Sequence, residues 1–313
     1  MPAEARPAPG SAVIQVRDLV KHYRGAPGKA LAGVSFEVTE GTLFCLLGPN
    51  GAGKTTTASI LTTTLTPTSG HASIAGFDVV TDQARVRRVV GIVFQQPALD
   101  VNLTAEENIR LHAVLYGCFP WRPSWRLMPA GYRRQVAGLA GTLGLAGTPG
   151  LTGTPGAGDW LRRPVRALSG GTRRKLEIVC ALLPRPRVLF LDEPTAGLDP
   201  QTRRNLWAYL EESRAELGTT VFLTTHYLEE AEAADAICVL AGGRVIERGS
   251  PAEIKARYPS PAPAAPAARG ATSLENAYLV LLEQAGADRA AGHDRGTRHD
   301  QAAGHDRAAA GLS

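Results

Sequence analysis

A glycine-rich segment followed by a lysine and a threonine has the pattern of a phosphate-binding loop. Residues 48–55 read Gly-Pro-Asn-Gly-Ala-Gly-Lys-Thr, after an apolar run and before a stretch typical of a helix. Glycines let backbone N–H groups converge on an anion, and the following helix N-terminus adds a favourable dipole. Lys54 would reach the β- and γ-phosphates, and the Thr55 hydroxyl would ligate Mg²⁺. We predict a nucleotide contact at Gly48, Pro49, Asn50, Gly51, Ala52, Gly53, Lys54, Thr55 and Thr56.

A second segment places two carboxylates directly after an apolar run. Val188-Leu-Phe-Leu191 precedes Asp192 and Glu193, as expected for a buried parallel strand with acids at its carboxyl end. There Asp192 would hold Mg²⁺ directly or through water, and Glu193 would polarise a water attacking the γ-phosphate. The alternative is an ordinary strand end with solvated acids. A phosphate loop in the same chain favours the catalytic interpretation.

A histidine ends the next β-rich run. Residues 220–225 read Thr-Val-Phe-Leu-Thr-Thr and lead into His226. If this strand neighbours the acidic one, His226 would hydrogen-bond the γ-phosphate and hold the water in place. A lone histidine is more often structural, but its position after the strand favours the catalytic role.

These residues need an α/β framework, which the 313-residue chain can supply. The hydrophobic fraction of 44% and charged fraction of 20% suit a globular protein. From 13 to 258, β-rich runs alternate with helical stretches. Residues 1–12 resemble a disordered lead-in without the apolar core of a signal peptide, and no apolar run approaches the ~20 residues of a membrane span. We therefore predict a cytosolic chain.

The remaining boundaries follow from composition. The segment at about 100–175 combines helical character with loops rich in Gly, Pro and Trp, which predicts a helical subdomain with inserts. A Pro/Ala linker at 259–271 precedes a short helix at 272–285, with a capping box beginning at Thr272 and an apolar face expected to dock. Residues 286–313 form a His/Asp/Arg near-repeat. A disordered tail is preferred there to a metal site, since no fixed ligand spacing appears.

Charge and cysteine content restrict the partners. The net charge of +5 admits nucleic acid or an acidic membrane surface. Basic residues are mostly arginine, with five lysines, which indicates a compositional bias rather than a nucleic-acid footprint. We expect no nucleic acid. The four cysteines lack metal-type spacing and are interpreted as small apolar residues in a reducing compartment.

A third motif separates this chain from other phosphate-loop proteins. Leu168-Ser-Gly-Gly-Thr172 closely resembles the ABC signature, commonly LSGGQ, and the motif order along 13–258 is also similar to that family. The resemblance implies a P-loop NTPase of the ABC type. Its nucleotide-binding domain would combine a RecA-like core sheet, an antiparallel β subdomain and a helical signature subdomain. The cofactors implied are ATP and Mg²⁺.

The resemblance also implies roles for residues that spacing alone does not assign. Tyr23 would stack on adenine, although an ordinary strand tyrosine is the alternative. Gln95 would sense Mg²⁺ and the γ-phosphate and contact a transmembrane partner; Gln96 is adjacent, so the register is open by one. Asp199 would link two active sites. Three signature residues would bind the ATP held by a second copy, in a head-to-tail homodimer: Ser169, Gly170 and Gly171.

Several longer stretches resemble one branch of the family, the daunorubicin-resistance type of exporter ATPase. They include SGGTRRKLEI, HYLEEAEAADAICVL and the late helix that begins at Ser273. The resemblance implies a separate permease of the ABC-2 type, a peripheral position at the cytoplasmic face of the membrane, and export of a drug or other hydrophobic compound. Thr172 departs from the usual glutamine or methionine, and the inserts in the helical subdomain, at about 118–131 and 146–159, are unusual.

Other classes of protein fit less well. A soluble ABC ATPase acting on ribosomes usually has two cassettes, and one acting on DNA has long coiled coils; this chain shows one phosphate loop, one signature and no sustained heptads. A P-loop kinase or transferase would lack the signature. A degenerate cassette that only binds ATP is disfavoured because Glu193 and His226 are both present.

Overall fold

The computed structural model describes residues 11–94, 98–145, 160–195, 197–259 and 273–286. The predicted lead-in, linker and tail lie outside these residues, apart from one or two positions at their ends, and so does the insert at 146–159. Within the described part of the chain, no helix is both long enough and apolar enough to cross a bilayer.

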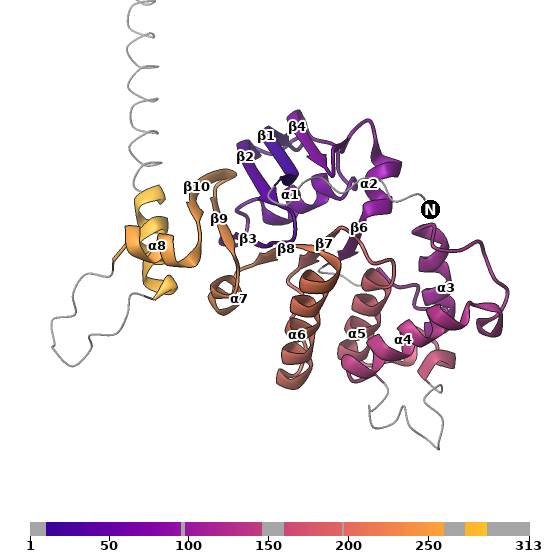
Figure 1. Cartoon of the computed structure of the whole chain (residues 1–313). Helices are drawn as coiled ribbons and strands as arrows, with labels where there is room; N and C mark the ends of the chain where they lie inside the picture. Colours follow the sequence, from indigo (N-terminus) through magenta and orange to yellow (C-terminus); the bar gives the residue numbers. More distant parts are fainter. Residues whose placement is uncertain (1–10, 95–97, 146–159, 196, 260–272, 287–313) are drawn as a thin grey trace, which may run out of the picture.

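A mostly parallel sheet forms the centre of the molecule (Figure 1). Six strands from the described residues lie in the order β10-β9-β3-β8-β7-β6. Neighbours from β9 to β6 run parallel, and β10 joins antiparallel to β9. The strands are β3 (Leu43–Leu47), β6 (Val90–Val93), β7 (Val188–Asp192), β8 (Thr220–Thr225), β9 (Ala236–Ala241) and β10 (Arg244–Gly249).

The central strands are apolar without alternation because both faces of the sheet are covered. All residues of β3, β7 and β8 are buried. Along β3, Leu43, Cys45 and Leu47 enter the core shared with the helices. Phe44 and Leu46 enter a second core on the opposite face. The apolar run before the phosphate loop and the run predicted to be a buried strand before Asp192 therefore both lie in the middle of the sheet, as β3 and β7.

An antiparallel sheet covers the second face. Its strand order is β2-β1-β4-β5 among the described residues. Aromatic rings join the layers: Phe36 lies 5.3 Å from Phe44 between ring centroids, and Phe44 lies 5.3 Å from Phe222. The strands are β1 (Ala12–His22), β2 (Lys29–Thr39), β4 (Ser69–Ile74) and β5 (Phe77–Asp78).

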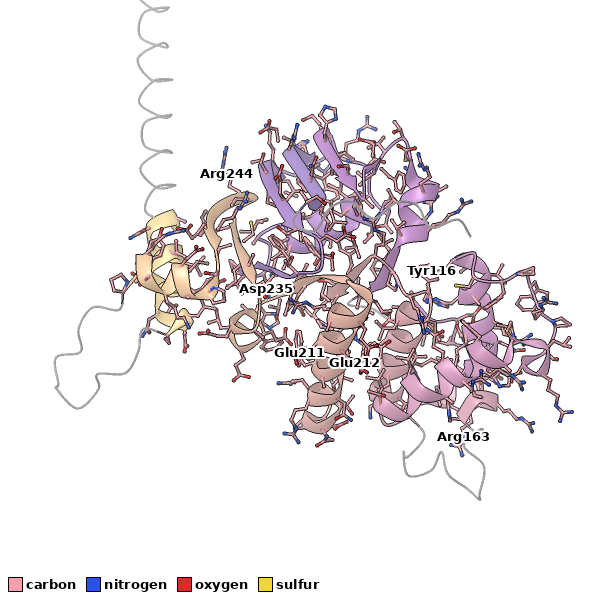
Figure 2. All side chains as sticks on the ribbon, viewed as in Figure 1. Tyr116, Arg163, Glu211, Glu212, Asp235 and Arg244 are labelled. Atoms are coloured by element: carbon pink, nitrogen blue, oxygen red, sulfur yellow. The ribbon has the colours of Figure 1, made fainter. Side chains whose placement is uncertain are left out.

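Helices cover the other face and form a separate lobe beside it. Figure 2 shows this lobe, with Tyr116 and Arg163, at the opposite end of the view from Arg244 on β10. Short 3₁₀ turns at Trp125–Leu127, Trp160–Arg162 and Val165–Ala167 complete it. The helices on this face and in the lobe are α3 (Ala105–Leu115), α4 (Ala130–Thr142), α5 (Gly170–Leu182), α6 (Pro200–Leu217), α7 (Leu228–Glu232) and α8 (Pro251–Arg257). Two further helices, α1 (Lys54–Leu61) and α2 (Gln83–Val89), pack in the second core, on the side of the antiparallel sheet.

Residues 274–286 form a further helix that docks on the domain through its apolar face. Leu274, Ala277 and Leu281 are buried in the helix-side core. The cap differs from the prediction by one residue: the backbone N–H of Asn276 donates to the Ser273 hydroxyl at 3.2 Å. Serine accepts this bond as readily as threonine. The cap is therefore Ser273, which directly precedes Leu274, the first buried residue of the helix.

Candidate nucleotide-binding and hydrolysis site

Parallel pairing brings three sequence motifs to one edge of the sheet. Leu47, the last residue of β3, pairs with Thr225 of β8, and Asp192 of β7 pairs with Thr224. The phosphate loop begins directly after Leu47. Glu193 follows Asp192, and His226 follows Thr225. They therefore emerge from the carboxyl ends of three adjacent strands, where ligands bind in open α/β sheets.

The phosphate loop requires glycine at two positions where other parts of the chain lie too close for a side chain. A Cβ on Gly48 would lie 2.3 Å from the Leu240 carbonyl oxygen, and Gly53 has a φ of +107° beside Leu31. Gly53 is also the N-cap of α1 and supplies no side-chain hydrogen bond. The first N–H groups of α1 thus lack a side-chain cap, which suits the binding of an anion.

Lys54 lies inside the loop. Its Nζ donates to the carbonyl oxygens of Gly48 at 2.7 Å and Pro49 at 3.1 Å. Burial lowers the pKa of Lys54, while the nearby carboxylates of Glu193 and Asp192 oppose that shift. A buried ammonium with two carboxylates close by is arranged to receive phosphate oxygens.

Asp192 has the surroundings of a magnesium ligand. Its carboxylate is buried and accepts hydrogen bonds from the Thr224 and Thr55 hydroxyls, while burial raises its pKa. Among the described residues no cluster of three or more His, Cys, Asp or Glu side chains could hold a metal. Mg²⁺ beside a nucleotide takes one or two protein oxygens, with phosphate and water completing its shell. Thr55 and Asp192 fit that requirement.

Glu193 and His226 are in direct contact. His226 Nδ1 lies 2.8 Å from Glu193 Oε1. The Glu193 backbone is in the left-handed region, with φ +48°, and its N–H donates to the Thr224 carbonyl at 3.0 Å. This turn directs the carboxylate after β7 toward the histidine after β8. A carboxylate and an imidazole in contact can bind one water molecule and accept its proton.

Tyr23 lies close to the phosphate-loop helix. The residue is 43% exposed, and its hydroxyl is 3.4 Å from the Thr56 hydroxyl. Lys21 Nζ lies 5.4 Å from the ring centroid. An exposed aromatic face beside the loop can stack on a nucleotide base.

The signature forms a second cluster, on other elements. Ser169 caps α5 and accepts from the Thr172 N–H at 3.2 Å, and the two hydroxyl oxygens are 2.8 Å apart. A Cβ on Gly171 would lie 3.4 Å from the Gly197 carbonyl oxygen. Lys175 Nζ lies 3.4 Å from the Asp199 carboxylate. The signature thus adjoins the segment that carries Asp199.

Asp199 also has a structural role that the sequence reasoning did not include. It caps α6, accepting from the Thr202 N–H at 2.9 Å and the Thr202 hydroxyl at 2.6 Å. These bonds hold the pKa of the Asp199 carboxyl well below its usual range, and Lys175 contributes to the same shift.

Gln95 and Gln96 lie outside the described residues, which leaves their register open. The residues on either side are described, and both contact α5. An arginine of the signature helix, Arg174, donates to the Phe94 carbonyl, and the Ala98 N–H donates to the Glu177 carboxylate at 3.1 Å. Sequence reasoning missed Arg174 and Glu177 because a run of basic residues usually indicates a solvated helix face. An Arg and a Glu three positions apart were the available signal.

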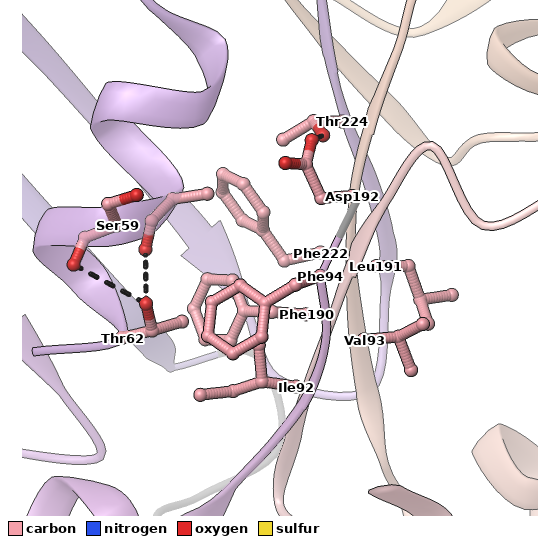
Figure 3. Close-up of a pocket in the computed structure, with 11 residues that line it drawn as sticks. Ser59, Thr62, Ile92, Val93, Phe94, Phe190, Leu191, Asp192, Phe222 and Thr224 are labelled. Atoms are coloured by element: carbon pink, nitrogen blue, oxygen red, sulfur yellow. Dashed lines mark hydrogen bonds between the residues drawn. The ribbon is translucent and has the colours of Figure 1, made fainter. Parts of the chain in front are cut away.

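A small pocket behind Asp192 is packed rather than open to a ligand. Figure 3 shows Asp192 and Thr224 at one end and the rings of Phe94, Phe190 and Phe222 at the other. This apolar backing keeps water from the rear of the carboxylate, which strengthens its bonds to hydroxyl groups.

The fold and the site together define an ATP-binding cassette ATPase: a phosphate loop and an acidic strand on a parallel sheet, with a signature helix in a separate lobe. The sequence profile described as ABC transporter matches residues 31–196. The chain belongs to the ABC transporter family, and the predicted α/β fold of that family is confirmed.

Relatives indicate the branch. The chain is 41% identical over 245 residues to the doxorubicin resistance ATP-binding protein DrrA of Mycobacterium tuberculosis (strain H37Rv), covering 78% of this chain and 67% of that protein. It is 38% identical over 243 residues to the daunorubicin/doxorubicin resistance ATP-binding protein DrrA of Streptomyces peucetius, covering 77% and 66%. The match thus spans about two thirds of these relatives, and the predicted resemblance to that branch is confirmed.

Solved structures agree with the architecture. The ATP-binding subunit of an ABC transporter aligns with a TM-score of 0.71 and 31% identity, covering 86% of this chain and 99% of that one. A dimeric ATP-binding cassette in a post-hydrolysis state, bound to ADP and phosphate, aligns with a TM-score of 0.63 and 27% identity, covering 76% and 98%.

Proposed function

We propose that this chain is the ATP-hydrolysing subunit of an ABC-2-type exporter, driving efflux of a drug or other hydrophobic compound through a separate permease. Two copies would act together at the cytoplasmic face of the membrane. The contact between Glu193 and His226, at the same sheet edge as Lys54, supports hydrolysis. The names of the relatives support export.

The residues of this chain divide the work of hydrolysis. The phosphate loop and Lys54 hold the β- and γ-phosphates, and Tyr23 stacks on the base. Thr55, Asp192 and Gln95 would hold Mg²⁺, which when bound would neutralise charge on the phosphate oxygens. Glu193 accepts a proton from the attacking water, and His226 keeps that water in place. Ser169, Gly170 and Gly171 of a second copy complete the site.

The helical lobe offers a surface for the permease. Trp121 and Leu127 are 56% and 57% exposed on the loop between α3 and α4, beside the exposed side chains of Arg122 and Arg126. The inner side of this loop is ordered: Arg110 donates to the Arg122 carbonyl at 2.7 Å. A held loop with apolar and basic side chains directed outward is suited to binding a partner.

The test is Mg²⁺-dependent ATP hydrolysis by the purified chain, alone and with its co-purified permease in lipid. We expect hydrolysis to rise with the permease. Replacing both exposed apolar residues, Trp121→Ser with Leu127→Ser, should reduce that rise and leave hydrolysis by the chain alone unchanged. Hydrolysis that ignores the permease but responds to ribosomes or DNA would contradict the exporter assignment.

A further inference from the structure

One arginine of the signature helix contacts the turn that carries the proposed general base. Arg174 is the fifth residue of α5 and is 5% exposed. Its guanidinium donates to the carbonyl oxygens of Asp192 at 3.0 Å, Glu193 at 3.2 Å and Pro194 at 3.3 Å. Three consecutive carbonyls of one turn are thus held by a single side chain. Only a planar group with several N–H donors can do this.

A buried carboxylate orients this arginine. Glu177 Oε2 lies 2.7 Å from Arg174 Nη1, and the Glu177 side chain is only 2% exposed. The other carboxylate oxygen accepts from the Ala98 N–H, and Arg174 also donates to the Phe94 carbonyl. Because the pair is out of water, breaking it would leave an unpaired buried charge, so its geometry is well determined.

The turn that Arg174 holds needs support. Glu193 has a φ of +48°, which is unfavourable for a residue with a side chain and persists only where surrounding bonds impose it. Its N–H is bound to Thr224 and its carbonyl to Arg174. Both ends of the residue are therefore fixed, and its carboxylate lies against His226.

We propose that Arg174, oriented by Glu177, is a positioning residue for hydrolysis that holds Glu193 in its left-handed conformation. This inference rests on the proposed role of Glu193 as general base. It has a consequence for the dimer, because Arg174 lies on the same helix as Ser169. The helix that binds the ATP of the partner subunit also sets the general base of its own subunit, so closure on one nucleotide is transmitted to the other site.

Two variants test the proposal. Arg174→Lys retains the positive charge beside Glu177 but cannot reach three carbonyls at once. The double variant Arg174→Met with Glu177→Met removes both buried charges together and should fold, since such pairs can be replaced by apolar residues. In both we expect kcat to fall by about 10- to 100-fold, the cost typical of a slightly misplaced catalytic group, while the Kd for ATP changes little.

A second readout separates positioning from a general structural defect. With Mg²⁺ and ATP, both variants should accumulate an ATP-bound dimer on size-exclusion chromatography, because closure occurs while hydrolysis is slowed. Arg187→Lys is the matched control, a half-buried arginine paired with Glu40 at 2.9 Å at the other end of β7. It should retain kcat and form no trapped dimer.

Two outcomes would overturn the proposal. One is an unchanged kcat in Arg174→Lys. The other is a joint loss of ATP affinity, thermal stability and kcat in both variants, which would make the pair a structural element only. Failure of the general-base assignment is distinguished by Glu193→Gln: if that variant hydrolyses ATP at the parent rate, the proposed role of Glu193 fails irrespective of Arg174.

Discussion

At the scale of single residues, the site depends on a few polar groups with determined partners. Lys54 is satisfied by loop carbonyls, Asp192 by two hydroxyls, and Glu193 by His226. Each group is at least partly removed from water, where hydrogen bonds and charges have larger effects. Exchange of one polar atom should therefore change one step of the cycle and leave the fold intact.

The general base provides the clearest such exchange. Glu193→Gln keeps the shape of the side chain and removes its ability to accept a proton, so we expect ATP binding to persist while turnover is abolished. The ATP-bound dimer should then accumulate, measurable by size-exclusion chromatography with nucleotide analysis. Lys54→Ala is the contrasting variant, because it removes a phosphate contact and should weaken ATP binding itself. Parent-rate hydrolysis by Glu193→Gln would show that the base lies elsewhere.

At the scale of elements, capping side chains determine where the functional helices begin. Ser169 caps the signature helix, Asp199 caps α6, and Thr104 with Glu107 forms a capping box on α3. The start of α3 is also joined to the segment before the signature, since the Ala105 N–H donates to the Arg163 carbonyl at 3.1 Å and Val165 donates to Leu103 at 2.9 Å. These bonds hold the lobe together around its predicted inserts.

The capping box on α3 predicts a pH-dependent stability. Thr104→Ala should lower the free energy of unfolding by about 1 kcal/mol at pH 7. Hydrogen bonds from the Thr104 N–H and hydroxyl lower the pKa of Glu107. A carboxyl group whose pKa is lowered in the folded state stabilises the fold at pH values above its ordinary pKa of about 4.3. This stabilisation is lost as the pH falls through the pKa of the folded state. The difference between variant and parent should therefore shrink toward pH 3.

Urea denaturation at several pH values measures this difference. Thr66→Ala is the control, an exposed threonine outside the capping box, and should stay within about 0.5 kcal/mol of the parent throughout. An equal loss for Thr104→Ala at pH 7 and pH 3 would mean that Glu107 takes no part in the cap.

At the scale of the whole molecule, the phosphate loop and the signature lie on different elements, and the signature adjoins Asp199 in the helical lobe. If each ATP is held by the loop of one copy and the signature of the other, a dimer of two defective chains retains one intact site. Lys54→Ala disables the loop, and Ser169→Arg disables the signature.

We expect each of these variants to be inactive alone and a one-to-one mixture to recover hydrolysis. Half of the dimers formed at random would be mixed, and each would hold one intact site of two, so about a quarter of the parent rate should return. Steady-state hydrolysis after mixing and re-equilibration measures the recovery. An inactive mixture in which mixed dimers demonstrably form would contradict the head-to-tail arrangement.

The ligand chemistry and the fold class follow from short stretches of the sequence. Residues 48–55 encode an anion-binding turn, and residues 168–172 distinguish the family. The buried runs that end at Leu47 and Asp192 encode parallel strands. These patterns are readable because backbone conformation, strand burial and helix capping depend on residues close together in the chain. The docked face of the final helix was likewise predictable from its apolar spacing, although its cap proved to be Ser273.

How these segments contact one another depends on the packing of the whole domain. It placed His226 against Glu193, 33 positions apart, and Arg174 beneath a turn about 20 positions away. It also gave Glu193 its left-handed backbone, which no local pattern required. A charged side chain on a basic helix becomes a buried positioning group only under two conditions. Packing must remove it from water, and it must lie next to carbonyl groups that need a hydrogen-bond donor. That outcome depends on how strands and helices distant in sequence come together.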